Sequence, residues 1–106
     1  MRQIVAIVKP YRVERVLDAL KLAPIEECEV REVKGWGRQK SYLDEYRGSE
    51  YSMAYLPKVE ITLWVDDPRV EEVVRLIVDN ARTGRQGDGK IFVLPAEAIF
   101  QGTPRP

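Results

Sequence analysis

Apolar residues occur in strand-like and helix-like patterns in turn along the first third of the chain. Residues 3–8 read QIVAIV, a β-branched run that is apolar on both faces and predicts a central strand. A helix is predicted over 11–22, with Pro10 suited to its first turn and Ala23-Pro24 ending it. Its evidence is a set of apolar residues at helical spacing: Val13, Val16, Leu17 and Leu20.

Strand-like and helix-like patterns follow one another again further along the chain. Cys28 to Trp36 predicts a second strand, and apolar residues alternate with polar ones from Val59 to Asp66 in a third. Asp66-Asp67-Pro68 is typical of a helix start, with an acid as N-cap, and the helix that follows should end near Asn80-Ala81. KIFVL, residues 90–94, predicts a fourth, short strand.

These elements predict one α+β domain over residues 1–106. Two β-α-β units folded together form a ferredoxin-like βαββαβ domain, a four-stranded antiparallel sheet with both helices on one face. The other face still carries apolar side chains. Burial of that face by oligomerisation is therefore expected.

A polar segment of unusual length joins the second and third predicted strands. Gly37 to Leu56 holds four tyrosines, two glycines and charges of both signs, with little aliphatic content. A connection this long in a small domain is usually functional. We interpret it as an exposed arm that contacts partners.

Composition excludes several classes of function. Lys+Arg and Asp+Glu both number 17, so nothing in the net charge points to nucleic acid or an anionic membrane. There are no histidines, which rules out imidazole catalysis and imidazole metal sites. Cys28 is the only cysteine, and no secretory signal or membrane-length apolar run is evident, which favours a cytoplasmic protein without direct membrane insertion.

Two glycine-bearing basic segments are candidate anion sites. In TGRQGDGKIF, residues 83–92, the glycines allow positive φ and Lys90 adds a charge, so backbone N–H groups could form an anion-binding nest. The alternative is a tight turn into a strand. KGWGRQK, residues 34–40, is the second candidate, and a solvated loop base is its alternative. Lys58 could pair with a carboxylate ligand or be a surface lysine, and the Gln39 amide could coordinate Mg²⁺.

These segments together resemble the PII family of trimeric signal-transduction proteins over about residues 1–100. YRGSEY, residues 46–51, is similar to the motif of the family's long T-loop, here 37–56. TGRQGDGKIFV, residues 83–93, is similar to the motif of its B-loop, here 82–90. KGWGRQK and LPKVEI stand at the corresponding places.

The resemblance implies a homotrimer that binds ATP or ADP as effectors in three clefts between subunits. The residues implied to line each cleft are Gly37, Arg38, Gln39, Gly87, Asp88, Gly89 and Lys90. Gln39 would help to hold Mg²⁺ beside ATP, and Gln39 and Lys58 would receive 2-oxoglutarate. Ligands would set the T-loop conformation, and the T-loop would then control a transporter, enzyme or regulator, without catalysis, in nitrogen metabolism.

The resemblance also locates modification sites and one departure. Tyr51 stands where some members carry a nucleotidyl group, and Ser49 where another branch is phosphorylated. The family's C-terminal arginines are replaced by Gln101 and Thr103 in an atypical tail over 101–106. This departure leaves open an alternative, a divergent member that responds to ADP, AMP or another small ligand and serves a metal-efflux or bicarbonate transporter.

Three rival classes fit the sequence less well. An RNA-binding module of the same fold would need strand aromatics and a basic surface. An acylphosphatase-like hydrolase would need a general base, which is not evident. A metal-binding trimer would have only carboxylates and one thiol as ligands.

Overall fold

The computed structural model describes residues 1–23, 25, 27–39, 52–85 and 88–97, with side chains at all of these except 36–39 and 52–55. Strand β1 (Arg2–Val8) leads through a 3₁₀ turn, η1 (Pro10–Arg12), into helix α1 (Val13–Leu20). Strands β2 (Cys28–Gln39) and β3 (Ser52–Val65) follow. A second 3₁₀ turn, η2 (Asp67–Arg69), then leads into helix α3 (Val70–Ala81) and strand β4 (Gly89–Pro95).

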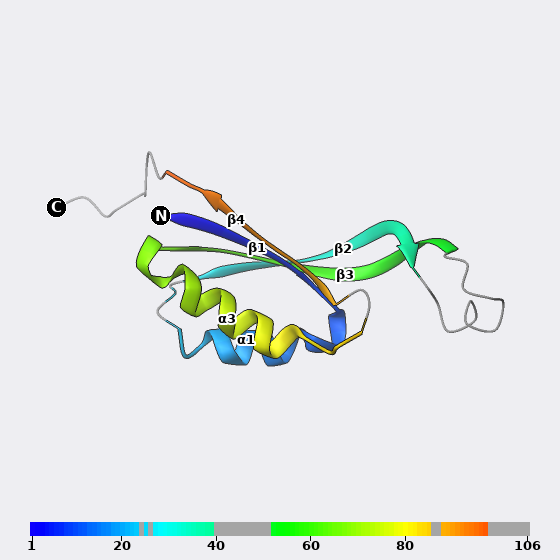
Figure 1. Ribbon diagram of the computed structural model, residues 1–106, viewed down its shortest axis with the longest axis horizontal. Helices are drawn as coiled ribbons and strands as arrows, with labels where there is room; N and C mark the ends of the chain where they lie inside the picture. Colours follow the sequence, from blue (N-terminus) through cyan, green and yellow to red (C-terminus); the bar gives the residue numbers. More distant parts are fainter. Residues whose placement is uncertain (24, 26, 40–51, 86–87, 98–106) are drawn as a thin grey trace.

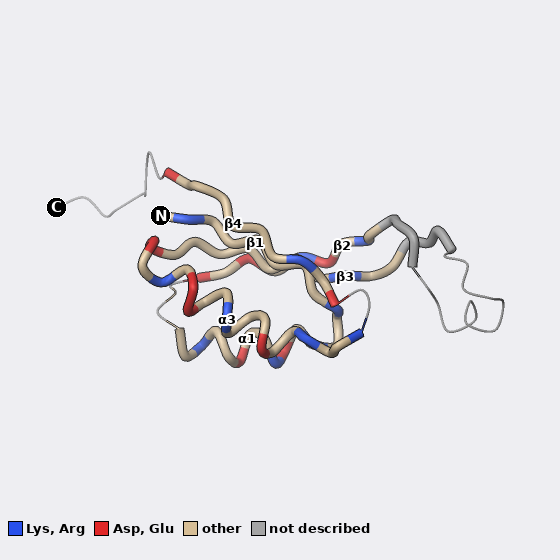
Figure 2. The backbone as a smooth tube through the Cα atoms, viewed as in Figure 1, with Lys and Arg blue, Asp and Glu red and all other residues tan. Residues whose placement is uncertain are grey.

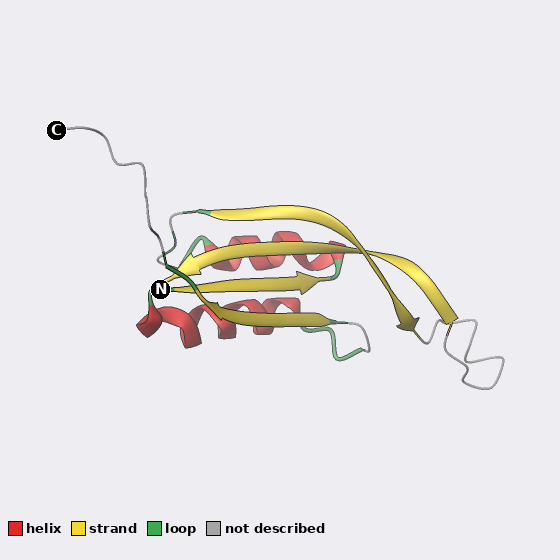
Figure 3. Cartoon of the chain, turned by 90° about the horizontal axis from the view of Figure 1, so that it is seen from above, coloured by secondary structure: helices red, strands yellow, loops and turns green. Residues whose placement is uncertain are grey.

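The four strands form one antiparallel sheet in the order β2-β3-β1-β4. Both helices lie against the same face of the sheet and run roughly along its strands (Figure 1, Figure 3). Because β1 and β3 occupy the centre, each half of the chain contributes one central and one edge strand. This confirms the ferredoxin-like βαββαβ fold that the sequence predicted.

The core lies between the sheet and the two helices. Alternate residues of β1 and β3 point into it, while α1 and α3 contribute residues four apart, as one face of a helix requires. Each buried aliphatic side chain contributes about 1.5–3 kcal/mol to folding. The side chains buried most deeply are Ile4, Val8, Val16, Leu20, Ile61, Leu63, Val73 and Ile77.

The sheet face opposite the helices, here called the open face, is partly apolar. Val5 of β1 pairs with Thr62 of β3 on one side and Phe92 of β4 on the other, and these three positions alternate with the core positions. Phe92 is 51% exposed, whereas Thr62 is buried, with 5% exposure. A half-exposed phenylalanine beside aliphatic neighbours is the kind of surface that a partner subunit covers.

The helices begin later than the sequence predicted. The predicted helix over 11–22 is a 3₁₀ turn followed by an α-helix that ends at Leu20. Asp66 does stand at the N-cap of η2, but its side chain makes no capping hydrogen bond. The carboxylate of Asp67 instead lies 3.0 Å from the terminal amine of Met1, and this hydrogen bond lowers the pKa of Asp67.

The two middle strands run further than predicted, and this corrects the expected bounds of the polar connection. The sequence ended the second strand at Trp36, but β2 continues to Gln39 and β3 already begins at Ser52. Gly37 pairs with Ala54, so both ends of the predicted 37–56 segment are paired strand. β2 and β3 thus extend beyond the rest of the sheet as a two-stranded arm (Figure 1). Residues 40–51, including the candidate sites Ser49 and Tyr51, lie outside the described residues.

Candidate functional site

The chain segment between α3 and β4, residues 82–88, approaches the end of β1. Acidic and basic positions both occur where β1 ends and β4 begins (Figure 2). Asp88, Gly89 and Lys90, three of the predicted site residues, lie here, while Gly87 lies outside the described residues. Lys90 is exposed at the start of β4, where it pairs with Ile7 of β1.

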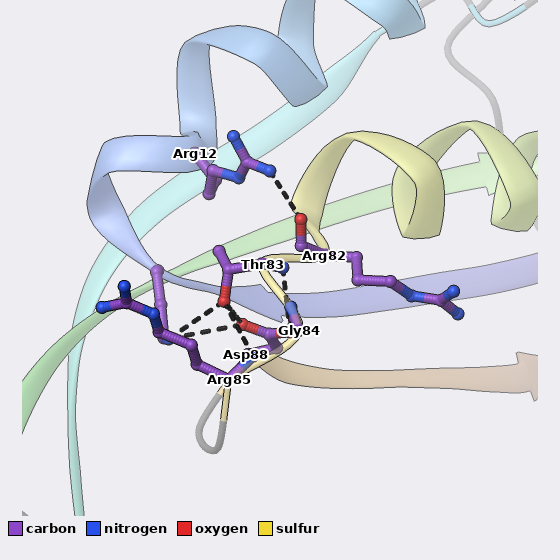
Figure 4. A network of polar contacts seen from close by, with 7 residues as sticks. Arg12, Arg82, Thr83, Gly84, Arg85 and Asp88 are labelled. Carbon is purple, nitrogen blue, oxygen red and sulfur yellow. Dashed lines mark hydrogen bonds and ion pairs between the residues drawn. The ribbon is translucent and has the colours of Figure 1, made fainter.

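The Asp88 carboxylate organises the first half of this segment. It accepts hydrogen bonds of 2.9 Å from the backbone N–H groups of Thr83 and Gly84, and it also accepts one from the Thr83 hydroxyl (Figure 4). The N–H of Arg85 donates to Thr83 Oγ1 at 3.2 Å. The backbone nest that the sequence suggested for an external anion is therefore filled, over residues 83–85, by the chain's own carboxylate.

Lys9, which follows β1, completes this cluster. Its Nζ lies 3.3 Å from Asp88 Oδ1 and 3.4 Å from Thr83 Oγ1, and both charged side chains are largely screened from solvent. The Thr83 hydroxyl, the Thr83 and Gly84 N–H groups and Lys9 together hold the pKa of Asp88 well below its usual range, in spite of partial burial. Asp88 is therefore a fixed negative charge at neutral pH.

Gly89 occupies a position that accepts no side chain. Its φ is 130°, and a Cβ added there would lie 1.8 Å from the carbonyl oxygen of Ile7. Gly84 also has a positive φ, 79°, but a Cβ there would meet nothing within 4 Å. The glycine at 89 is thus required by close packing of β4 on β1, and the glycine at 84 by backbone conformation alone.

Arg12 anchors the beginning of the segment. Its guanidinium donates a 2.5 Å hydrogen bond to the carbonyl oxygen of Arg82, just after the end of α3 (Figure 4). A cation at this position also suits the negative end of the α3 dipole. Lys9, Arg12 and Thr83 were not singled out from the sequence as site residues, although Thr83 stands within the quoted motif.

The predicted carboxylate-binding residue, Lys58, lies next to this cluster. Val8 pairs with both Val59 and Gly89, so the residues one step beyond them, Lys58, Lys9 and Asp88, follow one another across the same end of the sheet. The Lys58 side chain lies over Gly35 of β2, whose added Cβ would be 3.8 Å from Lys58 Cγ. Burial lowers the pKa of Lys58, the charge of Lys9 lowers it further, and Asp88 opposes the change.

The structure does not bring Gly37, Arg38 and Gln39 to this cluster within one chain. Gly89 is level with Glu32 of β2, through the pairs Gly89–Val8, Val8–Val59 and Val59–Glu32. Gly37 is five residues further along β2 than Glu32, which corresponds to about 16 Å of extended strand. Gln39 is likewise six residues beyond Val33, the partner of Lys58. The predicted residues therefore form two groups, one beside β4 and one on the arm.

A cavity of about 310 Å³ adjoins the first group. It lies between α3 and the paired strands β1 and β4, with apolar walls that include Val74, Val78 and Ile91. Charged residues that line it are Arg82, Asp88 and Lys90. Its combination of apolar walls and a few charges is typical of a small-molecule site.

Within the described part of the chain, no three acidic or cysteine side chains gather where they could hold a metal ion. Over the same residues, no helix has the length and apolar content that crossing a membrane requires. Gln39, the predicted Mg²⁺ ligand, has its backbone in β2. Its side chain is not among those that the structure describes.

A ferredoxin-like sheet with an extended β2–β3 arm, and a glycine-containing loop braced against β1 beside a small cavity, defines a class of small α+β domains. The family model described as "Nitrogen regulatory protein P-II" matches residues 1–101. The chain belongs to this family.

Curated relatives agree with the family match. The chain is 46% identical to the nitrogen regulatory protein P-II of Azospirillum brasilense over 101 residues, which cover 95% of this chain and 90% of that protein. With the same coverage it is 44% identical to the P-II protein of Nostoc punctiforme and 42% identical to the nitrogen regulatory protein GlnK of Escherichia coli K12. It is therefore a regulatory protein of nitrogen control rather than an enzyme, of a family that binds adenine nucleotides as effectors.

Proposed function

We propose that this chain senses adenine nucleotides in clefts between the subunits of a homotrimer and controls a target protein through the T-loop segment 37–56. The observation that carries the proposal is the braced loop between α3 and β4. It leads to Lys90, which is exposed beside a small cavity, and its Thr83 and Gly84 backbone N–H groups are held by the Asp88 carboxylate. A preorganised loop with a free cation is suited to a phosphate chain.

In this proposal the loop contributes Gly87, Asp88, Gly89 and Lys90 to the nucleotide site. Asp88 acts through its backbone, because its carboxylate is already occupied by Thr83 and Gly84. Arg38 and Gln39, with Gly37, belong to the same site. Gln39 helps to coordinate Mg²⁺ when ATP is bound, and Gln39 and Lys58 receive 2-oxoglutarate.

The distance between the arm and the loop supports a site built from two subunits. Gly37 is about 16 Å along the strand from the level of Gly89, so one chain in this conformation does not close the cleft. A neighbouring subunit packed on the open face could supply the missing wall. Phe92, half exposed on the edge strand β4 of that face, is the residue that such packing would bury.

The partner is a membrane transporter or regulatory enzyme of nitrogen metabolism, contacted in the cytoplasm through the T-loop. The names of the relatives support the link to nitrogen. Tyr51 and Ser49, at the far end of the T-loop, are the proposed positions of modification. Both lie outside the described residues.

A second candidate follows from the tail. The match to the family model covers residues 1–101. By the resemblance, Gln101 and Thr103 stand where the family carries arginines that reach nucleotide phosphates. A charge-assisted contact contributes about 1.5–3 kcal/mol. The loss of two such contacts favours a protein that prefers ADP or AMP to ATP and that controls another kind of transporter, such as one for metal efflux or bicarbonate.

Calorimetric titration with ATP, ADP and AMP, each with and without Mg²⁺ and 2-oxoglutarate, tests both candidates. The proposal expects binding of at least one adenine nucleotide at submillimolar concentration. A higher affinity for ADP or AMP than for MgATP would select the second candidate. No heat of binding from any of the three at millimolar concentration would contradict nucleotide sensing altogether.

A further inference from the structure

Arg12 holds the point at which the chain leaves α3. Arg82 is the first residue after that helix, and its backbone is extended, with φ −67° and ψ 132°. Its N–H donates to the carbonyl oxygen of Val78 at 3.0 Å, so the helix fixes one side of the residue. The carbonyl on its other side accepts the 2.5 Å hydrogen bond from the Arg12 guanidinium (Figure 4). The exit from α3 is therefore set by a side chain 70 residues away in the sequence.

Arg12 is itself attached to the end of β1. It is the last residue of η1, and its N–H donates to the carbonyl oxygen of Lys9 at 3.0 Å. The same short turn thus contacts both ends of segment 82–88, through Arg12 at Arg82 and through Lys9 at Asp88. This turn gives the segment a defined place relative to the strands that carry the proposed nucleotide site.

The surroundings of Arg12 contribute little to stability. Its Nε is buried and has no hydrogen-bond acceptor among the described residues, and none of their acidic side chains forms an ion pair with its guanidinium. A buried donor without an acceptor opposes folding, which offsets the hydrogen bond to Arg82. An apolar side chain of similar length would avoid this penalty. We therefore expect the net contribution of Arg12 to stability to be small.

The equivalent residue in the second half of the chain, Arg69, shows that the turn itself does not require such a contact. Arg69 ends η2 as Arg12 ends η1, with φ −99° in both and ψ −6° and −8°. The Arg69 guanidinium stays within its own helix, 3.0 Å from Glu72. The corresponding position after Arg12 holds Arg15, which cannot serve as a partner, and Arg12 contacts the end of α3 instead.

We propose that Arg12 is a positioning residue for segment 82–88, one that fixes the backbone where the chain leaves α3 and adds little to the stability of the domain. The inference rests on the proposed function, because a segment that is already held in place loses less freedom when a ligand binds. Arg12 does not contact the ligand. It raises the fraction of molecules whose segment is ready to bind, and apparent affinity rises with that fraction.

Arg12→Met tests this role, with Arg15→Met as the matched control. Met keeps an unbranched stem but donates no hydrogen bond, and Arg15 is an exposed arginine one turn further along the chain. Both variants are titrated calorimetrically with the adenine nucleotide that the unmodified protein binds best. Arg12→Met should raise the dissociation constant about tenfold, the effect of ordering about one backbone residue on binding. Arg15→Met should leave it unchanged.

Two further measurements separate positioning from simpler roles. The melting temperature of Arg12→Met should lie within about 3 °C of that of the unmodified protein, whereas a structural role would lower it further. The rise in dissociation constant should persist at about 0.5 M NaCl, because a displaced backbone, unlike a missing charge, is not screened by salt.

Amide hydrogen exchange, followed by NMR without nucleotide, reports on the segment directly. In Arg12→Met the amide of Gly84 should exchange several times faster than in the unmodified protein, while that of Ile61 in the central strand β3 should be unchanged. Equal exchange at Gly84 in the two proteins would mean that Arg12 does not fix the segment.

Three other results overturn the positioning role and leave nucleotide sensing intact. They are an unchanged dissociation constant for Arg12→Met, an equal rise for Arg15→Met, and a rise that disappears at high salt. A larger fall in melting temperature, or a variant that does not fold, assigns Arg12 to stability instead. Failure of the unmodified protein to bind any adenine nucleotide refutes the proposed function itself, and exchange at Gly84 then still decides whether Arg12 fixes the segment.

Discussion

Two adjacent residues, Asp88 and Gly89, fix the loop before β4 by different physical means. Asp88 satisfies two backbone N–H groups that would otherwise lack an acceptor within the segment. Gly89 allows β4 to approach β1 so closely that a single methyl group would overlap the Ile7 carbonyl. The first effect is electrostatic and the second is steric, so the two residues respond differently to substitution.

Gly89→Ala should destabilise the protein much more than Gly84→Ala. Both glycines have positive φ, which costs an L-residue about 1–2 kcal/mol. Only Gly89 adds a backbone overlap, at 1.8 Å, so its loss should reach about 3 kcal/mol or more. Urea denaturation of both variants measures the difference in unfolding free energy. Equal losses would mean that β4 can shift away from β1 at little cost.

The sequence located this loop but not the contacts that hold it. Asp88, Gly89 and Lys90 were identified from the motif and the resemblance, whereas Lys9 was not singled out. Lys9 and Thr83 are 74 residues apart in the chain, and no spacing rule links a lysine after one strand to a hydroxyl before another. Their contact follows from the register of β1 with β4, which only the folded chain supplies.

At the scale of elements, the sequence pattern predicted each strand and α-helix that the structure describes but placed several ends wrongly. The apolar pattern reports burial, and in β1 and β3 the buried apolar side chains are those that face the helices. The arm, where Gly37 pairs with Ala54, extends past the helical layer, so its residues lack the alternation that marks a half-buried strand. Backbone pairing continues in the arm without an apolar pattern, and the sequence therefore predicted a loop for these residues.

The helix starts were missed for a related reason. Pro10 is the first residue of η1 and Pro68 is the second residue of η2, and in each case the α-helix begins directly after the 3₁₀ turn. Proline marks the place where the chain turns into the helix direction but does not distinguish a 3₁₀ turn from an α-turn. The predicted core positions of α1, Val16 and Leu20, are correct because helical spacing does not depend on the cap.

At the scale of the whole molecule, the unequal faces of the sheet matter most. One face is covered by α1 and α3, and the other carries Val5, Thr62 and Phe92 in one row. Burial of a half-exposed aromatic residue contributes favourably to association at about 25 cal/mol per Å². In the proposed trimer, this face is the contact between copies of the chain and also sets the geometry of the nucleotide clefts.

Phe92→Glu should prevent assembly of the proposed trimer and leave monomers. The substitution places a charge on a surface that the proposal buries, without touching the core between sheet and helices. Light scattering after size exclusion measures the mass. Leu22→Glu, an equally drastic change at an 86% exposed residue after α1, is the matched control and should leave the mass unchanged. If the Phe92→Glu protein is still a trimer, the open face is not the contact between subunits.

The proposal that the loop before β4 and the adjoining Lys90 bind the phosphates of an adenine nucleotide is tested by Lys90→Ala. Loss of a charged phosphate contact should raise the nucleotide dissociation constant by about tenfold or more. Lys21→Ala, which removes an exposed lysine from the end of α1, serves as the control and should leave affinity unchanged. Calorimetric titration of both variants with the nucleotide that the unmodified protein binds best gives the answer. A dissociation constant for Lys90→Ala equal to that of the unmodified protein would contradict the claim and return this loop to a structural turn.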